Sequence, residues 1–295
     1  MRAAICLLGA MAAIPAAQGF ELTSGVSMQY QSIAFWHDAS AASPLLGSPT
    51  SVLYYPDLLA PALKLGASWT VGDWTIEPQV LLQGVGSGQF RDTDYQANGL
   101  PFSDTFSTAS GGLGVRAQIR AVPGTTWQMG RVAAKPFIVA SFEGQSLAAQ
   151  GLTCGTVCAA PALSGEVTVM RHQIWSARAG VGAQGVLPIG ETDDLTARVS
   201  ASLGGLAIDD SHVLRTDLGP SPNIVYRTVV GSIDGELEYR RSLTGALSAA
   251  IVAGGGIDAG AGTATFGAST ATPQTFPAGY SSIRLHVGLE LTGKF

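Results

Sequence analysis

Alternation of apolar and polar positions is the strongest pattern along this chain. In residues 193–212, Leu195 and Leu203 share one parity, whereas Arg198 and Asp210 share the other. A period of two predicts a β-strand with one apolar and one polar face. If the apolar face meets lipid and the polar face lines a lumen, the end of this strand brings polar side chains to the mouth of a barrel.

The same pattern predicts about ten strands, an even number as in bacterial outer-membrane barrels. They are expected at residues 22–35, 58–71, 74–90, 106–122, 128–150, 167–186, 195–208, 224–240, 246–265 and 280–295. Short turns rich in turn-forming residues alternate with long loops, which are expected at residues 37–52, 91–105, 151–166, 209–223 and 268–279. Short periplasmic turns and long external loops are typical of a transmembrane antiparallel β-barrel, and no linker divides the chain into further domains.

Composition supports a membrane barrel. Charged residues make up 13% of the chain and the mean hydropathy is +0.27, whereas about 25% charged residues is usual for a soluble domain. After the N-terminus, no apolar run approaches the ~20 residues that a spanning helix needs. A closed barrel is then the remaining way to satisfy the backbone in lipid. The last segment agrees, because its apolar positions share one parity through to the terminal residue, as in closing strands of outer-membrane proteins: Ile283, Leu285, Val287, Leu289, Leu291 and Phe295.

The N-terminus has the features of a secretory signal peptide. A basic start is followed by a short apolar core and a small-residue cleavage region, which predicts a signal at residues 1–19 and a barrel at residues 20–295. An anchor helix is the alternative, but the run is short and Pro15 breaks it. Removing the signal takes away Arg2 and moves the net charge from −5 to about −6, so charge offers no argument for nucleic acid.

Two acidic motifs lie where predicted strands end. Asp210 precedes His212 by two residues, and a carboxylate beside an imidazole can hold its tautomer and make it a general base. Asp92 and Asp94 are close enough to repel, so one pKa should rise and the pair could hold a proton or position water. Solvated loops are the plain alternative for both motifs, and Asp-x-Asp could also be a fragment of a calcium site, although no further ligand spacing supports it.

The parity of the third predicted strand conflicts with an inward direction of its acidic pair. The lumen-facing positions are odd, as in Glu77 and Gln79, whereas Asp92 and Asp94 are even. A bulge near one of the glycines at positions 84, 86 or 88 would restore the inward direction.

The remaining candidates are structural. Cys154 and Cys158 are expected to form a local disulfide in an exported chain. The aromatic residues are expected to be mostly girdle or lipid-facing residues, not a sugar-stacking platform: Trp36, Tyr54, Tyr55, Trp69, Trp74, Trp127 and Trp175.

A ten-stranded barrel with Asp-Thr-Asp-Tyr from position 92 and Asp-Ser-His from position 210 resembles the omptin family of outer-membrane proteases. The segments 69–79 and 223–227 add to the similarity. The resemblance implies a bacterial outer-membrane endopeptidase that forms no covalent intermediate and needs no cofactor or metal. Its peptide or protein substrate would bind at the external mouth. His212 would be the general base, Asp210 would orient and stabilise it, and Asp92 and Asp94 would hold water and the scissile group.

The chain departs from omptins in two ways. Omptins that cleave beside Arg or Lys have an acidic residue where this chain has Ile208, and another late in the first strand, where it has Phe35, Trp36 and His37. A strong preference for basic residues is therefore not expected. The lipopolysaccharide motif of the family would fall near residues 142–146 and is not preserved. The competing hypothesis is a non-enzymatic barrel, such as a narrow channel, an adhesin or a structural protein.

Overall fold

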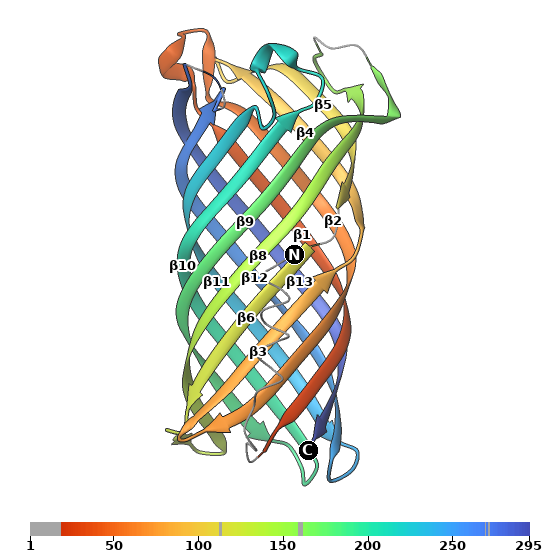
Figure 1. Ribbon diagram of the computed structural model, residues 1–295, viewed down its shortest axis with the longest axis vertical. Helices are drawn as coiled ribbons and strands as arrows, with labels where there is room; N and C mark the ends of the chain where they lie inside the picture. The colour runs from red at the N-terminus through yellow and green to blue at the C-terminus, as the bar shows by residue number, and fades with distance from the viewer. Residues whose placement is uncertain (1–18, 112–113, 159–161, 269, 271) are drawn as a thin grey trace.

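The computed structural model shows one closed cylinder of tilted antiparallel strands (Figure 1). It describes residues 19–111, 114–158, 162–268, 270 and 272–295, so nearly all of the predicted signal peptide lies outside the described residues. The strands are β1 (Glu21–His37), β2 (Leu46–Val71), β3 (Trp74–Gln83), β4 (Gly86–Gln96), β5 (Pro101–Gly111), β6 (Gly114–Pro123), β7 (Trp127–Met129), β8 (Val132–Cys154), β9 (Leu163–Pro188), β10 (Asp193–His212), β11 (Ile224–Ser242), β12 (Leu247–Phe266) and β13 (Gln274–Lys294). Two short 3-10 turns, η2 (Ser40–Ala42) and η3 (Thr216–Leu218), lie in the loops. No helix among the described residues is long and apolar enough to cross a membrane.

Hydrogen bonding closes the sheet into a ring. β1 pairs with both β2 and β13. β3 and β4 both pair with β2, while β5 and β6 both pair with β8, so each of these two couples makes a single strand of the barrel. The ring therefore has ten strands and is all antiparallel, which confirms the predicted fold class.

The strands extend further towards the loop end than the sequence pattern indicated. β2 begins at Leu46, not near residue 58, and β4 continues to Gln96 through a stretch predicted to be loop. β9 and β13 also begin earlier than expected, at Leu163 and Gln274. Alternation reports strands only where one face is apolar. On β2 the apolar face changes sides, because Leu59 and Leu63 are exposed on the outside whereas Leu53 and Tyr55 above them are buried inside. One lipid-facing pattern therefore does not mark the whole strand.

A strand irregularity turns the acidic pair into the lumen. The strand breaks after Gln83 and resumes at Gly86, and both residues are on the inside: Gln83 lines a lumen cavity and Gly86 is buried. These two inward residues are three positions apart, whereas inward residues of a regular strand are two apart. The inward positions therefore change from odd to even numbers at this point. The predicted bulge is thus present at this break, and Asp92 and Asp94 lie on the inward face.

The outer surface carries an apolar belt that ends below the mouth. Exposed apolar side chains on β9, β10 and β11 include Val181, Val199, Leu203, Val229 and Ile233. Above them the outward positions become polar, and Asp209 pairs with Arg227 across 3.5 Å. β2 and β9 have 26 residues each, whereas about 9–11 residues of a tilted strand cross a bilayer. The barrel therefore projects well beyond the membrane, and the loop end lies outside it.

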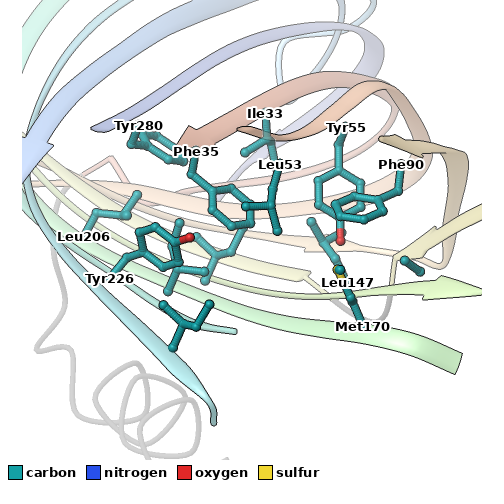
Figure 2. Close-up of a cluster of buried hydrophobic side chains, with 14 of the residues drawn as sticks. Ile33, Phe35, Leu53, Tyr55, Phe90, Leu147, Met170, Leu206, Tyr226 and Tyr280 are labelled. Carbon is teal, nitrogen blue, oxygen red and sulfur yellow. The ribbon is translucent and has the colours of Figure 1, made fainter. Parts of the chain in front are cut away.

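The lumen is filled in layers. Its middle holds an ion-pair network of Glu143, Arg178, Asp258 and Arg284. Above the network lies a cluster of buried apolar side chains (Figure 2), and ten of its members are Ile33, Phe35, Leu53, Tyr55, Phe90, Leu147, Met170, Leu206, Tyr226 and Tyr280. This apolar layer separates the polar lumen from the mouth and forms the floor on which the candidate site lies.

Candidate active site

Asp210 and His212 lie at the upper end of β10 and share its inward face, because side chains two residues apart on a strand point the same way. Asp210 is fully buried, whereas 14% of the His212 side chain is exposed at the mouth. His212 Nε2 lies 3.3 Å from Asp210 Oδ2. The contact leaves Nδ1 as the nitrogen of His212 that can accept a proton.

Asp92 and Asp94 reach the mouth from β4, well round the ring from β10. Both are partly buried, and Ser51 on β2 donates a hydrogen bond to Asp92 Oδ1 at 3.3 Å. Burial, together with repulsion from Asp94, raises the pKa of Asp92 to about 7. Burial also raises the pKa of Asp94. The pair is therefore a site where a carboxyl group changes charge near neutral pH.

The two motifs act on each other across the mouth. Burial alone would lower the pKa of His212, but the charge of Asp210 outweighs it, and with a contribution from Asp92 it raises the pKa to about 9. His212 in turn counteracts the rise in the pKa of Asp92. The sequence pattern predicts that the strands end just before these four residues. The structure extends β4 and β10 through them and brings both pairs to one opening.

Asp210 has a second imidazole partner that sequence reasoning missed. His172 on β9 is fully buried, and its Nε2 lies 3.1 Å from Asp210 Oδ1. Burial would raise the pKa of Asp210, but His212 and His172 together hold it well below its usual range. The available signal was parity, because His172 is on the inward face of β9, directly opposite Asp210 in the register.

Tyr55 completes this arrangement. Its hydroxyl lies 2.5 Å from His172 Nδ1. Tyr55 is an exception to the expectation that most of the aromatic residues belong to the girdle or face lipid, because its side chain is fully buried inside the barrel beside Phe90 (Figure 2). The upper part of β2 lacks the simple alternation of its lower part, since its register against β1 shifts between the partners of Gln31 and Ile33.

A third histidine lies at the same level without taking part in these contacts. His37 Nδ1 is 3.1 Å from the Tyr226 hydroxyl, and the side chain is buried. Burial lowers the pKa of His37 to about 4. His37 therefore adds no positive charge to the mouth at neutral pH.

The neighbouring loops are tied down by polar contacts. Cys154 and Cys158 form the predicted disulfide. Buried Asp104 on β5 accepts hydrogen bonds from Arg91 at 2.8 Å and from Thr93 at 3.0 Å. Arg91 thus stabilises the outer side of the strand that carries the acidic pair. Within the described part of the chain, no group of three or more His, Cys, Asp and Glu side chains is placed to hold a metal ion.

These features define a ten-stranded barrel of the outer-membrane type, with a cluster of carboxylates and imidazoles at its mouth. The solved structure of outer membrane protease OmpT from Escherichia coli has the same fold. The match has a TM-score of 0.75 and covers 95% of this chain and 98% of that one, at 11% sequence identity. The chain is therefore an omptin-like barrel, and at this identity the likeness concerns the fold alone.

Other solved barrels are less similar. The translocator domain of autotransporter NalP from Neisseria meningitidis matches over 97% of this chain and 95% of that one, at 13% identity and a TM-score of 0.32. The toluene transporter TodX from Pseudomonas putida covers 96% of this chain and 91% of its own, at 8% identity and a TM-score of 0.31. Both scores are too low to indicate the same fold. No protein-family model and no curated protein sequence matches the chain.

Proposed function

We propose that this protein is a bacterial outer-membrane endopeptidase that hydrolyses peptide bonds at the mouth of its barrel. The observation that carries the proposal is the contact between His212 and Asp210. The charge of Asp92, on a distant strand, also acts on His212 and helps to raise its pKa. A general base needs an oriented imidazole, a partner for its positive charge and access to water. His212 has all three, because it is paired with a buried carboxylate and is partly exposed at the mouth.

The chemistry follows from the placement of protons. A water molecule held by Asp92 and Asp94 gives a proton to His212 Nδ1 while its oxygen attacks the carbonyl carbon of the peptide. The attack gives a tetrahedral intermediate, and Asp210 stabilises the imidazolium that forms. The imidazolium then returns the proton to the amine nitrogen as the C–N bond breaks and the intermediate collapses to the carboxylic acid product. Water is the nucleophile and His212 carries the proton in both steps, so no covalent enzyme intermediate forms and no Ser or Cys nucleophile is required.

The interior supports an enzyme more than a channel. Below the site, the apolar cluster crosses the lumen with fully buried side chains such as Phe35 and Ile208. Beneath that, Arg178 and Arg284 both contact Asp258. An apolar constriction excludes water and ions, and a neutralised ion-pair network offers no continuous charged path. These layers close the floor of the mouth and leave the site open from outside.

A cleavage assay on the refolded chain tests the proposal. The protein in detergent micelles, with and without added lipopolysaccharide, is incubated with a mixed peptide library, and the products are read by mass spectrometry. We expect cuts that disappear with His212→Ala refolded in the same way. The absence of cuts under both conditions, or identical cuts from parent and variant, would refute the proposal.

A further inference from the structure

His172 does more than fill space beneath the site. We infer that it is a positioning residue for the proposed reaction, holding Asp210 Oδ1 so that Oδ2 is left for His212. The inference rests on the proposed function, but the contact itself can be tested without it. His172 and His212 lie against different oxygens of one carboxylate, at 3.1 Å and 3.3 Å.

The hydrogen-bonding capacity of the three groups allows one consistent arrangement. A neutral imidazole has one donor and one acceptor nitrogen. If the Tyr55 hydroxyl donates to His172 Nδ1, the ring proton lies on Nε2 and points to Asp210. The opposite tautomer would direct a lone pair at the carboxylate, which is repulsive. Outside these close contacts, His172 Nε2 and both oxygens of Asp210 have no hydrogen-bond partner among the described residues. Asp210 and Tyr55 therefore favour the same tautomer of His172, and that tautomer supports Asp210.

The surroundings of His172 exclude packing as its sole role. The ring lies in an apolar layer. Its centroid is 5.1 Å from the centroid of the Phe35 ring and 5.6 Å from that of the Phe90 ring. An apolar residue would fill this space without the cost of burying two ring nitrogens. The buried Asp210 carboxylate, in contrast, needs donors on both oxygens. Among the described residues no backbone N–H donates to either oxygen, and the His172 imidazole is placed 3.1 Å from Oδ1 to fill that role.

The contact has a defined effect on His212. A donor N–H facing the pair stabilises its negative form, Asp210 with neutral His212, more than its neutral form with His212 protonated. Removing that donor therefore raises the pKa of His212 above its present value of about 9. The other ionisable groups that act on the pair or lie against it remain in place: Asp92 and Asp94 from β4, His37 from β1, Tyr55 from β2, Tyr226 from β11, and Arg215 beyond β10.

Two substitutions separate the polar role from packing. His172→Phe keeps a ring and removes both nitrogens, whereas His172→Gln restores an N–H donor on a flexible side chain. The chain has four histidines, so nitrogen-15 labelling of histidine in micelles gives an assignable titration of His212. We expect its pKa to rise by about one unit in His172→Phe and to return towards the parent value in His172→Gln. An unchanged pKa in His172→Phe would overturn the inference.

Kinetics provide the second readout. Peptide cleavage by His172→Phe at pH 7 should fall about tenfold in kcat, with KM unchanged, and should recover as the pH rises past the shifted pKa. A loss that is equal at every pH would show a structural role only. If the parent cuts no peptide while the titration still shifts, the proposed function fails and the contact stands.

Tyr55→Phe covers the case in which His172→Phe does not fold. This variant keeps the ring contact of Tyr55 with Phe90 and removes the hydroxyl that lies against His172 Nδ1. The nitrogen-15 shifts of His172 in the parent protein should be those of the Nε2-protonated form, and in Tyr55→Phe the Nδ1 shift should change because that nitrogen loses its hydrogen-bond donor. A parent His172 protonated on Nδ1 would overturn the inference.

Discussion

His212 and Asp210 lie two residues apart on β10, and their side chains meet with Nε2 3.3 Å from Oδ2. Loss of either should therefore disable catalysis while the barrel still folds. We expect His212→Ala and Asp210→Ala each to reduce kcat/KM by a factor of about 10² or more, because general base catalysis typically contributes that much. Heat-modified mobility on gels reports folding. Cleavage at the parent rate by both folded variants would mean that the site is elsewhere.

The pH dependence follows from the same pair. His212 must be neutral to accept a proton, and its pKa is raised to about 9. The active form therefore accumulates as the pH rises towards about 9 and is lost as the pH falls below it. Asp92, with its pKa raised to about 7, acts in the same direction, because its ionised form holds water. We expect kcat/KM to rise steadily from about pH 6 to 9. A rate that is flat from about pH 5 to 8 would exclude histidine as the base.

Cleavage should show no strong preference for basic residues. A pocket for Arg or Lys needs a buried carboxylate to replace lost water. One position expected to supply it carries fully buried Ile208, and the other lies among Phe35, Trp36 and His37, none of which is acidic. Mixed peptide libraries should give cuts beside uncharged residues at least as often as beside cations. Two other acidic residues could take this role, but both already have partners: Asp38 accepts a hydrogen bond from Ser40, and Asp217 forms an ion pair with Arg215. A large majority of cuts directly after Arg or Lys would contradict this expectation.

The barrel should not conduct ions. Arg284 contacts Asp258 and lies 2.9 Å from Asp234, and the apolar layer above it blocks the lumen. Purified protein added to a planar bilayer should give no steady current at a concentration where a porin of similar mass conducts. Arg284→Ala combined with Arg178→Ala is the matched variant, since it removes the cations of the network and leaves the apolar layer in place. It should remain closed if that layer is the seal. Stable unitary currents from the parent chain would favour the channel hypothesis.

Much of the fold could be read from alternation alone. Lipid offers no partner to backbone groups, so an amphipathic strand pattern in a chain of low charge leaves the closed barrel as the solution. Parity also predicted that Asp210 and His212 share an inward face, and it identified the need for a bulge before Asp92. These features depend only on neighbours along the chain, which is why local sequence reported them.

Contacts across the barrel required the tertiary structure. His172 reaches Asp210 because the register of β9 against β10 places the two residues opposite each other, and that register is set by the whole ring and not by local pattern. Tyr55 lies in the lumen because the pairing of β1 with β2 shifts by one residue, and the identity of the aromatic residue does not predict that shift. The apolar floor under the mouth gathers Phe35, Phe90 and Ile208 from three separate strands. The sequence by itself determined a membrane barrel with carboxylates and an imidazole at its opening. Only the closed ring decided which side chains face one another there, because contacts between distant strands depend on the number of strands and their stagger.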